Sequence, residues 1–401
     1  MPSINTKKIR AAVIIAAPIF LFITILLSAM LWNSPKPEEK SVPTVSTDTA
    51  EETQAVWISY LEMQDILKNK SEAQFTASIG GYFDNCADIG INTIIFQVRS
   101  HGDAFYKSAL FPTSVHFTGT RQLSAPFDPL KIAVREAHAR KLKIEAWINP
   151  YRGPKIEDAK PLCDGGIFAK WLGTDKVFTA ASGSDTYYYL NPTDSEVQQY
   201  VIKGIREVAA GYDVDGIHFD DYFYPTQNPS VDAENYEKSG GGMSLADFRR
   251  KCVSDFIAEV YKTVKSIRNI PFGISPSGNI ANNTDRYYAD VKLWCSSKGY
   301  IDYIAPQLYW GYGEGTLPYD TALESWKSLI KSKDIRLIVG LAAYKVGENE
   351  YWRDGDILSR QVSDAQKCPQ YSGFALFRYS YLFSDICNSE REKLFKNQRI
   401  S

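Results

Sequence analysis

Two adjacent carboxylates at the end of an apolar stretch are the residues in this sequence best suited to chemistry. The run DGIHFDDYFYP occupies residues 215–225 and contains Asp220 and Asp221. Side chains of an extended strand alternate between faces, so Gly216, His218 and Asp220 share one face and the apolar residues between them share the other. A carboxyl pair can supply one proton donor and one anion to a reaction. The alternative is structural, since an acid can also cap a helix or hold a loop.

Aromatic, amide and charged side chains cluster after the ends of the other strand-like stretches. The apolar faces of sugar rings stack on aromatic rings, and sugar hydroxyls need amide or charged hydrogen-bonding partners. Each such residue taken alone is more often part of a core, so the prediction depends on their clustering. The candidate carbohydrate-binding residues are Gln97, Arg99, Trp147, Asn149, Tyr151, Arg152, His218, Tyr222, Tyr224, Ser275, Asn279, Gln307, Tyr309 and Trp310.

These residues need a scaffold that brings the ends of several strands together. Short, nearly continuous apolar runs predict strands buried on both faces, and they lie at 55–59, 92–98, 142–149, 213–220, 271–275, 301–309, 335–341 and 372–378. Helical patterns lie at 71–88, 128–141, 193–211, 244–268, 287–298, 320–333, 355–367 and 384–396. This alternation predicts an α/β fold, the (β/α)8 or TIM barrel.

The connections between these segments agree with a barrel. Helix-to-strand connections are very short, whereas the strand-to-helix connections at 99–127, 150–192 and 221–243 are long. A TIM barrel carries its functional loops at the carboxyl ends of the strands. We therefore expect Asp220 to project into the mouth of the barrel and Asp221 to lie at its rim. A doubly wound open sheet is the alternative, but no Gly-rich phosphate loop follows the first strand.

Two helix starts carry recognisable caps. Asp128 followed by Pro129 is typical of an N-cap and first helical position. Thr193 with Glu196 three residues later predicts a capping box at the start of the helix over 193–211.

The composition narrows the classes of function. Lys and Arg number 45 and Asp and Glu 47, for a net charge of −2, so no basic excess favours nucleic acid as a partner. The chain has 4 His and no HExxH, paired-Cys or calcium-loop pattern, so we expect no metal site and no cofactor. A GxSxG elbow is also missing from the sequence. The cysteines show no paired spacing and are predicted to be buried apolar residues; they are Cys86, Cys163, Cys252, Cys295, Cys368 and Cys387.

The N-terminal region predicts a membrane anchor. Residues 11–32 contain no charge, and a helix of this length spans about 33 Å, enough to cross a bilayer core of about 30 Å. The cations at 7, 8 and 10 precede it, so the positive-inside rule places 1–10 in the cytoplasm and the rest of the chain outside. A cleaved signal peptide is the alternative. Residues 33–52, rich in Pro, Ser, Thr and Glu, are predicted to be a disordered linker, and 53–396 to be the barrel.

Several motifs together resemble the glycosyl-hydrolase-like family 10 barrels, an exported bacterial group linked to cell-envelope glycans. They include AVWIS, INTIIFQVR, AWINPYR, DGIHFDDYFYP, FGISPSGN, IDYIAPQLYW and VGLAAYKVG, and the similarity covers nearly all of 53–390. The wider α-amylase-type barrels carry D-G-x-R-x-D at the corresponding strand, with the last Asp as nucleophile. Asp215, Gly216 and Asp220 match that pattern, and His218 stands where the Arg would.

The resemblance implies that Asp220 is the nucleophile or charge stabiliser and leaves the general acid open. The amylase-type acid ends the fifth strand, where FGISPSGN has no carboxylate. Asp221, Asp232 and Glu234 are candidates, with Glu234 preferred because its loop could fold over the cleft. Glu145 is a weaker candidate, because it lies in the middle of a strand.

The sequence therefore predicts a membrane-anchored glycoside hydrolase that acts outside the cytoplasm on envelope glycan such as peptidoglycan strands. Its partners would be carbohydrate and, through the N-terminal helix, the membrane. Asp220 would take the anionic role, and Glu234 or Asp221 the acid role. A barrel that binds wall glycan without cutting it is the alternative, and a metal-dependent deacetylase is a third hypothesis.

Overall fold

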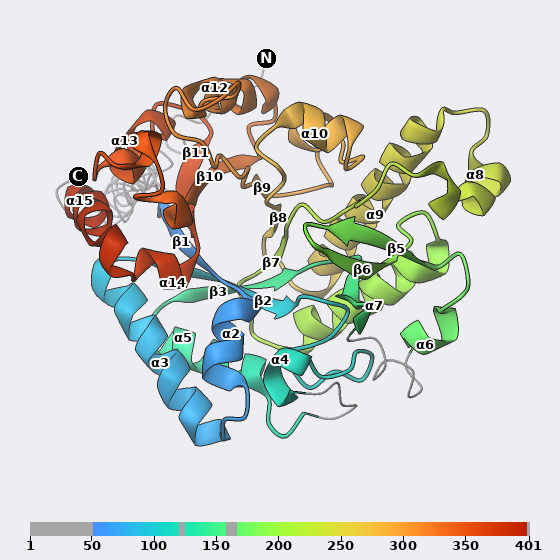
Figure 1. Cartoon of the computed structure of the whole chain (residues 1–401), viewed down its shortest axis with the longest axis horizontal. Coiled ribbons are helices and arrows are strands. Elements are labelled where there is room, and N and C mark those ends of the chain that lie inside the picture. The colour runs from blue at the N-terminus through green and yellow to red at the C-terminus, as the bar shows by residue number, and fades with distance from the viewer. Residues whose placement is uncertain (1–50, 120–124, 158–166, 399–401) are drawn as a thin grey trace, which may run out of the picture. The chain divides into compact units, whose positions relative to one another are not determined.

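The predicted strands close into a parallel barrel (Figure 1). The computed structural model describes residues 51–119, 125–157 and 167–398. Within them, the barrel follows the order β1-β11-β10-β9-β8-β7-β3-β2 and returns to β1. Its strands are β1 (Thr53–Ile58), β2 (Thr93–Arg99), β3 (Lys143–Ile148), β7 (Gly216–Phe219), β8 (Phe272–Ile274), β9 (Tyr303–Ile304), β10 (Arg336–Ala342) and β11 (Tyr371–Phe377). The TIM-barrel prediction is confirmed.

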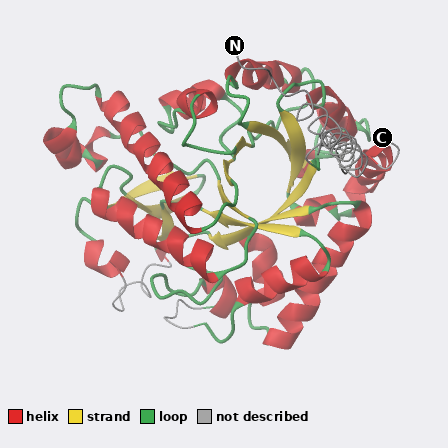
Figure 2. Cartoon of the chain, turned by 180° about the vertical axis from the view of Figure 1, so that it is seen from behind, coloured by secondary structure: helices red, strands yellow, loops and turns green. Residues whose placement is uncertain are grey.

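Helices surround the strands (Figure 2). They are α3 (Glu72–Ile89), α5 (Pro129–Ala139), α7 (Ser195–Gly211), α9 (Leu245–Ile267), α10 (Ile280–Asp285), α11 (Val291–Ser296), α12 (Tyr319–Leu329), α13 (Ile357–Ala365) and α15 (Asn388–Gln398). Each range predicted to be helical contains a helix. The range predicted over 287–298 contains only the short helix α11, and the short helix α10 before it was not predicted. The apolar faces of these helices pack on the outward side chains of the strands and form the main core.

The start of α7 differs from the prediction. The N-cap is Asp194, whose carboxylate accepts from the Val197 backbone N–H at 2.9 Å. Thr193 instead donates its hydroxyl to the side chain of Asn191 at 2.8 Å. The predicted capping box at Thr193 is wrong because its hydroxyl is engaged by the preceding loop, which leaves the next residue to cap the helix.

Alternation along the strands separates the barrel interior from the helix layer. Ile217 and Phe219 belong to the outer core, whereas Trp57, Trp147 and Tyr303 pack with smaller residues in a second cluster inside the barrel. Parallel register places Trp147 beside His218 on the neighbouring strand. The side chains that lead up to the mouth of the barrel are therefore inward residues of β1, β3, β7 and β9.

The loops at the carboxyl ends of the strands contain further elements. They include α2 (Tyr60–Leu67), α4 (Val115–Thr118), α6 (Ile167–Trp171), α8 (Ala233–Ser239) and α14 (Tyr379–Leu382). The long loop after β3 folds into an antiparallel sheet with order β4-β6-β5, which the sequence analysis did not predict. Its strands are β4 (Arg152–Lys155), β5 (Val177–Ser182) and β6 (Asp185–Leu190). This sheet lies to one side of the barrel, near α7 and α9 (Figure 1).

Two further sequence predictions concern cysteines and the membrane. Of the described cysteines, Cys86, Cys295, Cys368 and Cys387 are buried and free, and Cys252 is half-buried and free. Among the described residues, none of the helices combines the length and the apolar character needed to cross a bilayer. The predicted anchor at 11–32 and nearly all of the predicted linker lie outside the described residues.

Candidate active site

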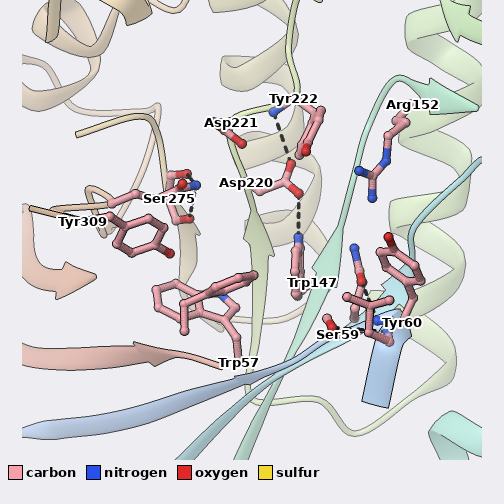
Figure 3. A pocket seen from close by; sticks show the side chains of 14 residues that line it. Trp57, Ser59, Tyr60, Trp147, Arg152, Asp220, Asp221, Tyr222, Ser275 and Tyr309 are labelled. Carbon is pink, nitrogen blue, oxygen red and sulfur yellow. Dashed lines mark hydrogen bonds between the residues drawn. The ribbon is translucent and has the colours of Figure 1, made fainter. Parts of the chain in front are cut away.

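A cavity of about 260 Å³ opens at the carboxyl ends of the barrel strands (Figure 3). Aromatic rings and polar groups line it in a mixed pattern. The lining residues are Trp57, Ser59, Tyr60, Leu61, Gln97, Trp147, Arg152, Asp220, Asp221, Tyr222, Ser275, Gln307, Tyr309 and Phe377. They come from loops or strand ends of β1, β2, β3, β7, β8, β9 and β11, which the closed barrel brings to one point.

Asp220 lies at the centre of this cavity, directly after β7. Its side chain shares the inward face with His218, as the alternation along the strand predicts, and the residue is 3% exposed. One carboxylate oxygen accepts from the indole N–H of Trp147 at 2.9 Å and from the side-chain amide of Asn149. The other oxygen accepts from the Tyr222 backbone N–H at 3.3 Å. Three donors thus converge on this group, which stabilises its ionised form.

A chain of amides fixes these donors. The Tyr60 backbone N–H donates to the side-chain oxygen of Gln97 at 2.8 Å. The Gln97 amide nitrogen then donates to the side-chain oxygen of Asn149 at 2.5 Å, which leaves the Asn149 nitrogen facing Asp220. Because each amide has one donor side and one acceptor side, the chain sets the orientation of every group from α2 to the carboxylate.

Asp221 also lines the cavity, although strand geometry alone would point it away. The chain leaves β7 after Phe219, so the strict alternation of a strand ends before Asp221. The residue is half-buried, and the nearby Gln307 side chain lines the same cavity and favours the ionised form of its carboxyl. Two consecutive residues therefore present carboxyls to the same space (Figure 3).

The pKa values of both carboxyls are raised. Burial, followed by repulsion from Asp221, raises the pKa of Asp220 to about 7 against the attraction of Arg152. Burial likewise raises the pKa of Asp221, opposed by hydrogen bonding and by Arg152. Two like charges in one poorly solvated space ionise in sequence rather than together. The pair is therefore set to retain a proton near neutral pH.

A hydrogen-bonded chain supports the floor of the cavity. The indole N–H of Trp57 donates to Nε2 of His218 at 3.3 Å, so the hydrogen of His218 resides on Nδ1. That Nδ1–H donates to the hydroxyl oxygen of Tyr303 at 2.7 Å, and the Tyr303 hydroxyl donates to Glu145. Burial lowers the pKa of His218 to about 3 and raises that of Glu145 to about 7. The imidazole is therefore neutral and orients the Trp57 ring.

A closed barrel with two acids at the carboxyl end of a strand is the geometry of many glycosidases, and the sequence comparisons agree. The model of the glycosyl hydrolase-like 10 family matches residues 52–354. The chain belongs to this family. It is 34% identical over 337 residues to glycosyl hydrolase DigH of Escherichia coli K12, covering 75% of this chain and 74% of DigH. It is 33% identical over 353 residues to glycosyl hydrolase YngK of Bacillus subtilis strain 168, covering 80% and 67%.

Solved structures share the fold at lower identity. The glycoside hydrolase domain of PgaB (BpsB) from Bordetella bronchiseptica aligns with a TM-score of 0.59 at 14% identity, covering 86% of this chain and 99% of that domain. Alpha-L-fucosidase isoenzyme 2 from Paenibacillus thiaminolyticus gives 0.56 at 14% identity, with 87% and 49% coverage. With its membership of the glycosyl hydrolase-like 10 family, the protein is a glycoside hydrolase.

The structure shows which candidate general acids of this glycosyl hydrolase-like 10 protein lie in the same cavity as Asp220. Glu234 lies on α8, is exposed, and forms an ion pair with Lys238 one turn later. It lines a different hollow, against β5 and β6, and not the cavity of Asp220. Asp232 is fully buried in an ion pair with Arg249. Glu145 lies two residues below Trp147 on β3, beneath the cavity floor. Among the described residues, Asp221 alone lies in the cavity with Asp220 as a second carboxyl.

About half of the predicted sugar-binding residues line the cavity. They are Gln97, Trp147, Arg152, Tyr222, Ser275, Gln307 and Tyr309. Asn149 touches Asp220, and His218 and Arg99 lie behind the lining, with Arg99 donating to the Pro150 carbonyl at 2.9 Å.

The structure places four predicted residues elsewhere. Tyr151 is buried against Phe256 in the outer core, and Tyr224 bonds to Asp232. Asn279 caps α10, and Trp310 accepts from Gln361 through its carbonyl oxygen.

The first and last strands also contribute lining residues that were not among the predicted ones. Trp57, Ser59 and Tyr60 line the cavity after β1, and Phe377 lines it at the end of β11. Ser59 caps α2, and its backbone N–H and hydroxyl both donate to Glu62, at 2.9 and 2.6 Å. The same rule that selected residues after the other strands would have found them in the segment AVWISY.

Proposed function

We propose that this glycoside hydrolase is anchored in the cell membrane by its N-terminal segment and cleaves envelope glycan, such as peptidoglycan strands, outside the cytoplasm. The observation that carries the reaction is that Asp220 and Asp221 line one cavity edged with aromatic rings. One carboxyl protonates the leaving glycosidic oxygen, and the other acts as an anion toward the sugar or a water molecule. The uncharged segment 11–32, preceded by three cations, supports the anchored location.

Asp220 takes the anionic role. Its two oxygens accept from Trp147, Asn149 and the Tyr222 backbone, so a proton on either oxygen would displace a donor that is already in place. Positive charge that develops on the sugar ring in the transition state is stabilised by a fixed carboxylate beside it.

Asp221 takes the role of general acid. Its carboxyl is half-buried, and burial raises its pKa. A raised pKa favours the protonated form of a carboxyl, and that form can transfer its proton to the leaving oxygen. Glu234, by contrast, is held ionised at the surface by Lys238, which lowers its pKa.

The cavity lining supports a sugar as the substrate. Trp57, Trp147, Tyr309 and Phe377 offer ring faces or edges, while amides and hydroxyls are interspersed among them. Sugar rings use both kinds of contact, since their faces are apolar and their edges carry hydroxyls.

Two conservative variants test the assignment. Asp220→Asn should abolish cleavage both of purified glycan strands and of an aryl glycoside of the same sugar, because the anion is required in each case. Asp221→Asn should lose about 10²- to 10⁴-fold on strands and far less on the aryl glycoside, whose leaving group needs no proton. Products are measured by mass spectrometry, with circular dichroism as the check of folding.

Three outcomes would contradict the proposal. Full activity of Asp220→Asn would remove that residue from the mechanism. Equal losses of Asp221→Asn on both substrates would remove Asp221 as the acid. Intact strands after incubation with the unaltered enzyme, under conditions where it binds them, would favour a barrel that binds envelope glycan without cutting it.

A further inference from the structure

Arg152 is a buried cation that faces the cavity. It is 8% exposed, and of the described residues it is the one cation in the cavity lining. It begins β4, the first strand of the small sheet that follows β3, and pairs with Tyr189 of β6. A buried guanidinium is costly unless acceptors surround it, so its partners indicate its purpose.

The protein uses only one side of this guanidinium. Nε donates to the Ser100 carbonyl oxygen at 3.0 Å. The guanidinium carbon lies 4.3 Å from the centre of the Tyr222 ring and 5.9 Å from that of Tyr60, which fixes its plane. Within the described part of the chain, neither terminal nitrogen has a protein acceptor. Figure 3 shows this end of Arg152 turned toward the cavity.

Charge balance with the catalytic pair does not account for this arrangement. Arg152 attracts Asp220 and Asp221 electrostatically, yet no ion pair joins it to either carboxyl among the described residues. A cation kept only to neutralise them would be expected to contact them directly. The carbonyl of Ser100 and the ring of Tyr222 instead hold the guanidinium apart, with two parallel N–H donors facing the cavity.

We propose that Arg152 forms a subsite for a sugar that carries a carboxylate. A guanidinium presents a planar fork that matches the two oxygens of a carboxylate, and such bidentate pairs are among the strongest hydrogen bonds in proteins. The ligand is either a sugar with a lactyl-ether carboxylate or a uronic acid, both of which present this group. This inference rests on the proposed function and narrows its substrate class.

The test compares substrates that differ in one group. Oligosaccharide strands bearing the lactyl-ether carboxylate are cleaved alongside the same strands after reduction of that carboxylate to an alcohol. A uronic-acid oligosaccharide and its reduced form make the second arm. The ratio of kcat/KM for the acidic and reduced forms is measured for the unaltered enzyme, Arg152→Gln, Arg152→Lys and Lys155→Gln. Lys155 is the matched control, because it lies on the same strand but pairs with Asp185 outside the cavity lining.

The unaltered enzyme should prefer the acidic form by about 10- to 100-fold in the arm that contains the natural sugar. Arg152→Gln should bring the ratio close to one, Arg152→Lys should give an intermediate ratio because it lacks the fork, and Lys155→Gln should retain the full preference. The ratio cancels any general loss from a change in the ionisation of Asp220. Thermal unfolding midpoints confirm that each variant folds.

Two outcomes overturn the inference while leaving the proposed function intact. One is cleavage of acidic and reduced strands at equal rates by the unaltered enzyme. The other is an equal loss on both forms in Arg152→Gln, which would restrict Arg152 to an electrostatic effect on Asp220. The absence of cleavage in every arm would contradict the proposed function itself.

Discussion

Asp220 and Asp221 are adjacent in the chain and in the cavity, so each affects the ionisation of the other. The repulsion of Asp221 contributes to the raised pKa of Asp220, about 7. Loss of activity on the acidic side of the pH profile should therefore follow protonation of Asp220 near pH 7. In Asp221→Asn this repulsion is gone, so the pKa of Asp220 falls and the acidic limb of the profile moves to lower pH.

The profile of kcat/KM against pH on an aryl glycoside measures this shift, because that substrate does not need the acid. Ser275→Ala is the matched control, since it removes a neutral lining group and leaves both carboxyls in place. An acidic limb at the same pH in Asp221→Asn and in the unaltered enzyme would contradict the coupling.

The buried carboxyl of Glu145 should make the free energy of unfolding depend on pH. Burial raises its pKa from 4.5 to about 7, so the folded protein holds a proton that the unfolded chain releases. This contribution to stability is complete below pH 4.5 and is lost as the pH rises toward 7 and beyond, by about 3 kcal/mol in total. Glu145→Gln cannot ionise and should show a shallower fall in the free energy of unfolding between pH 5 and pH 8.

Urea unfolding at the two pH values measures this difference. Asp220 contributes a fall in the same direction, so Asp220→Asn serves as a reference for the size of one buried carboxyl. A fall in Glu145→Gln as steep as in the unaltered protein would mean that Glu145 is ionised throughout.

The strand alternation that places Asp220 could be read from the sequence, whereas the position of Glu234 could not. Period two is a property of the extended backbone, so it applies wherever a strand is identified. The loop after β7 has no such period, and its path depends on contacts distant in sequence, such as the Asp232–Arg249 pair. Glu234 follows this buried ion pair in the chain and lies on α8 near β5 and β6, away from the cavity.

At the scale of elements, the Asp232–Arg249 ion pair fastens the loop after β7 to α9. Arg249 donates to both oxygens of Asp232, at 2.6 and 2.7 Å, and to the hydroxyl of Tyr288 at 3.0 Å. Both charged side chains are fully buried. Arg249→Met leaves Asp232 buried without its partner and should lower the free energy of unfolding by about 3–5 kcal/mol.

The next residue provides the control for this prediction. Arg250 also forms an ion pair, with Asp247, but the Asp247 side chain is 57% exposed. Arg250→Met should therefore change stability by about 1 kcal/mol or less. Equal losses in the free energy of unfolding of the two variants, measured by urea unfolding, would show that burial does not make the Asp232–Arg249 pair more important for stability.

At the scale of elements, the barrel could be predicted because its strands are nearly uniform in apolar character and alternate with amphipathic helices. The small β4-β6-β5 sheet was missed because it lies inside a connection already interpreted as a loop. Its signal was present: two β-rich runs, 177–182 and 185–190, flank Gly183 and Ser184. Gly183 has φ of +61°, as two-residue hairpin turns require. This sheet matters for function because it carries Arg152.

At the scale of the whole molecule, the proposed function requires that the barrel lie outside the cytoplasm. The barrel begins at β1, directly after the segment predicted to be a linker, so its exposure outside the cell depends on residues 1–52. The full chain should sediment with membranes and resist extraction at high pH, because an uncleaved apolar helix is held by the bilayer core and not by charge. External protease should degrade the barrel in cells whose outer layers have been removed.

The orientation depends on the cations at 7, 8 and 10. Their replacement by Glu removes the positive charge that is retained in the cytoplasm, so a reporter enzyme that is active only outside the cytoplasm, fused after residue 401, should lose most of its activity. Exchange of Lys for Arg at positions 7 and 8 and of Arg for Lys at position 10 keeps the charge and should keep the reporter active. Recovery of the unaltered chain in the soluble cytoplasmic fraction would contradict the anchor, and with it access to envelope glycan, although the chemistry of Asp220 and Asp221 would still apply to another glycan.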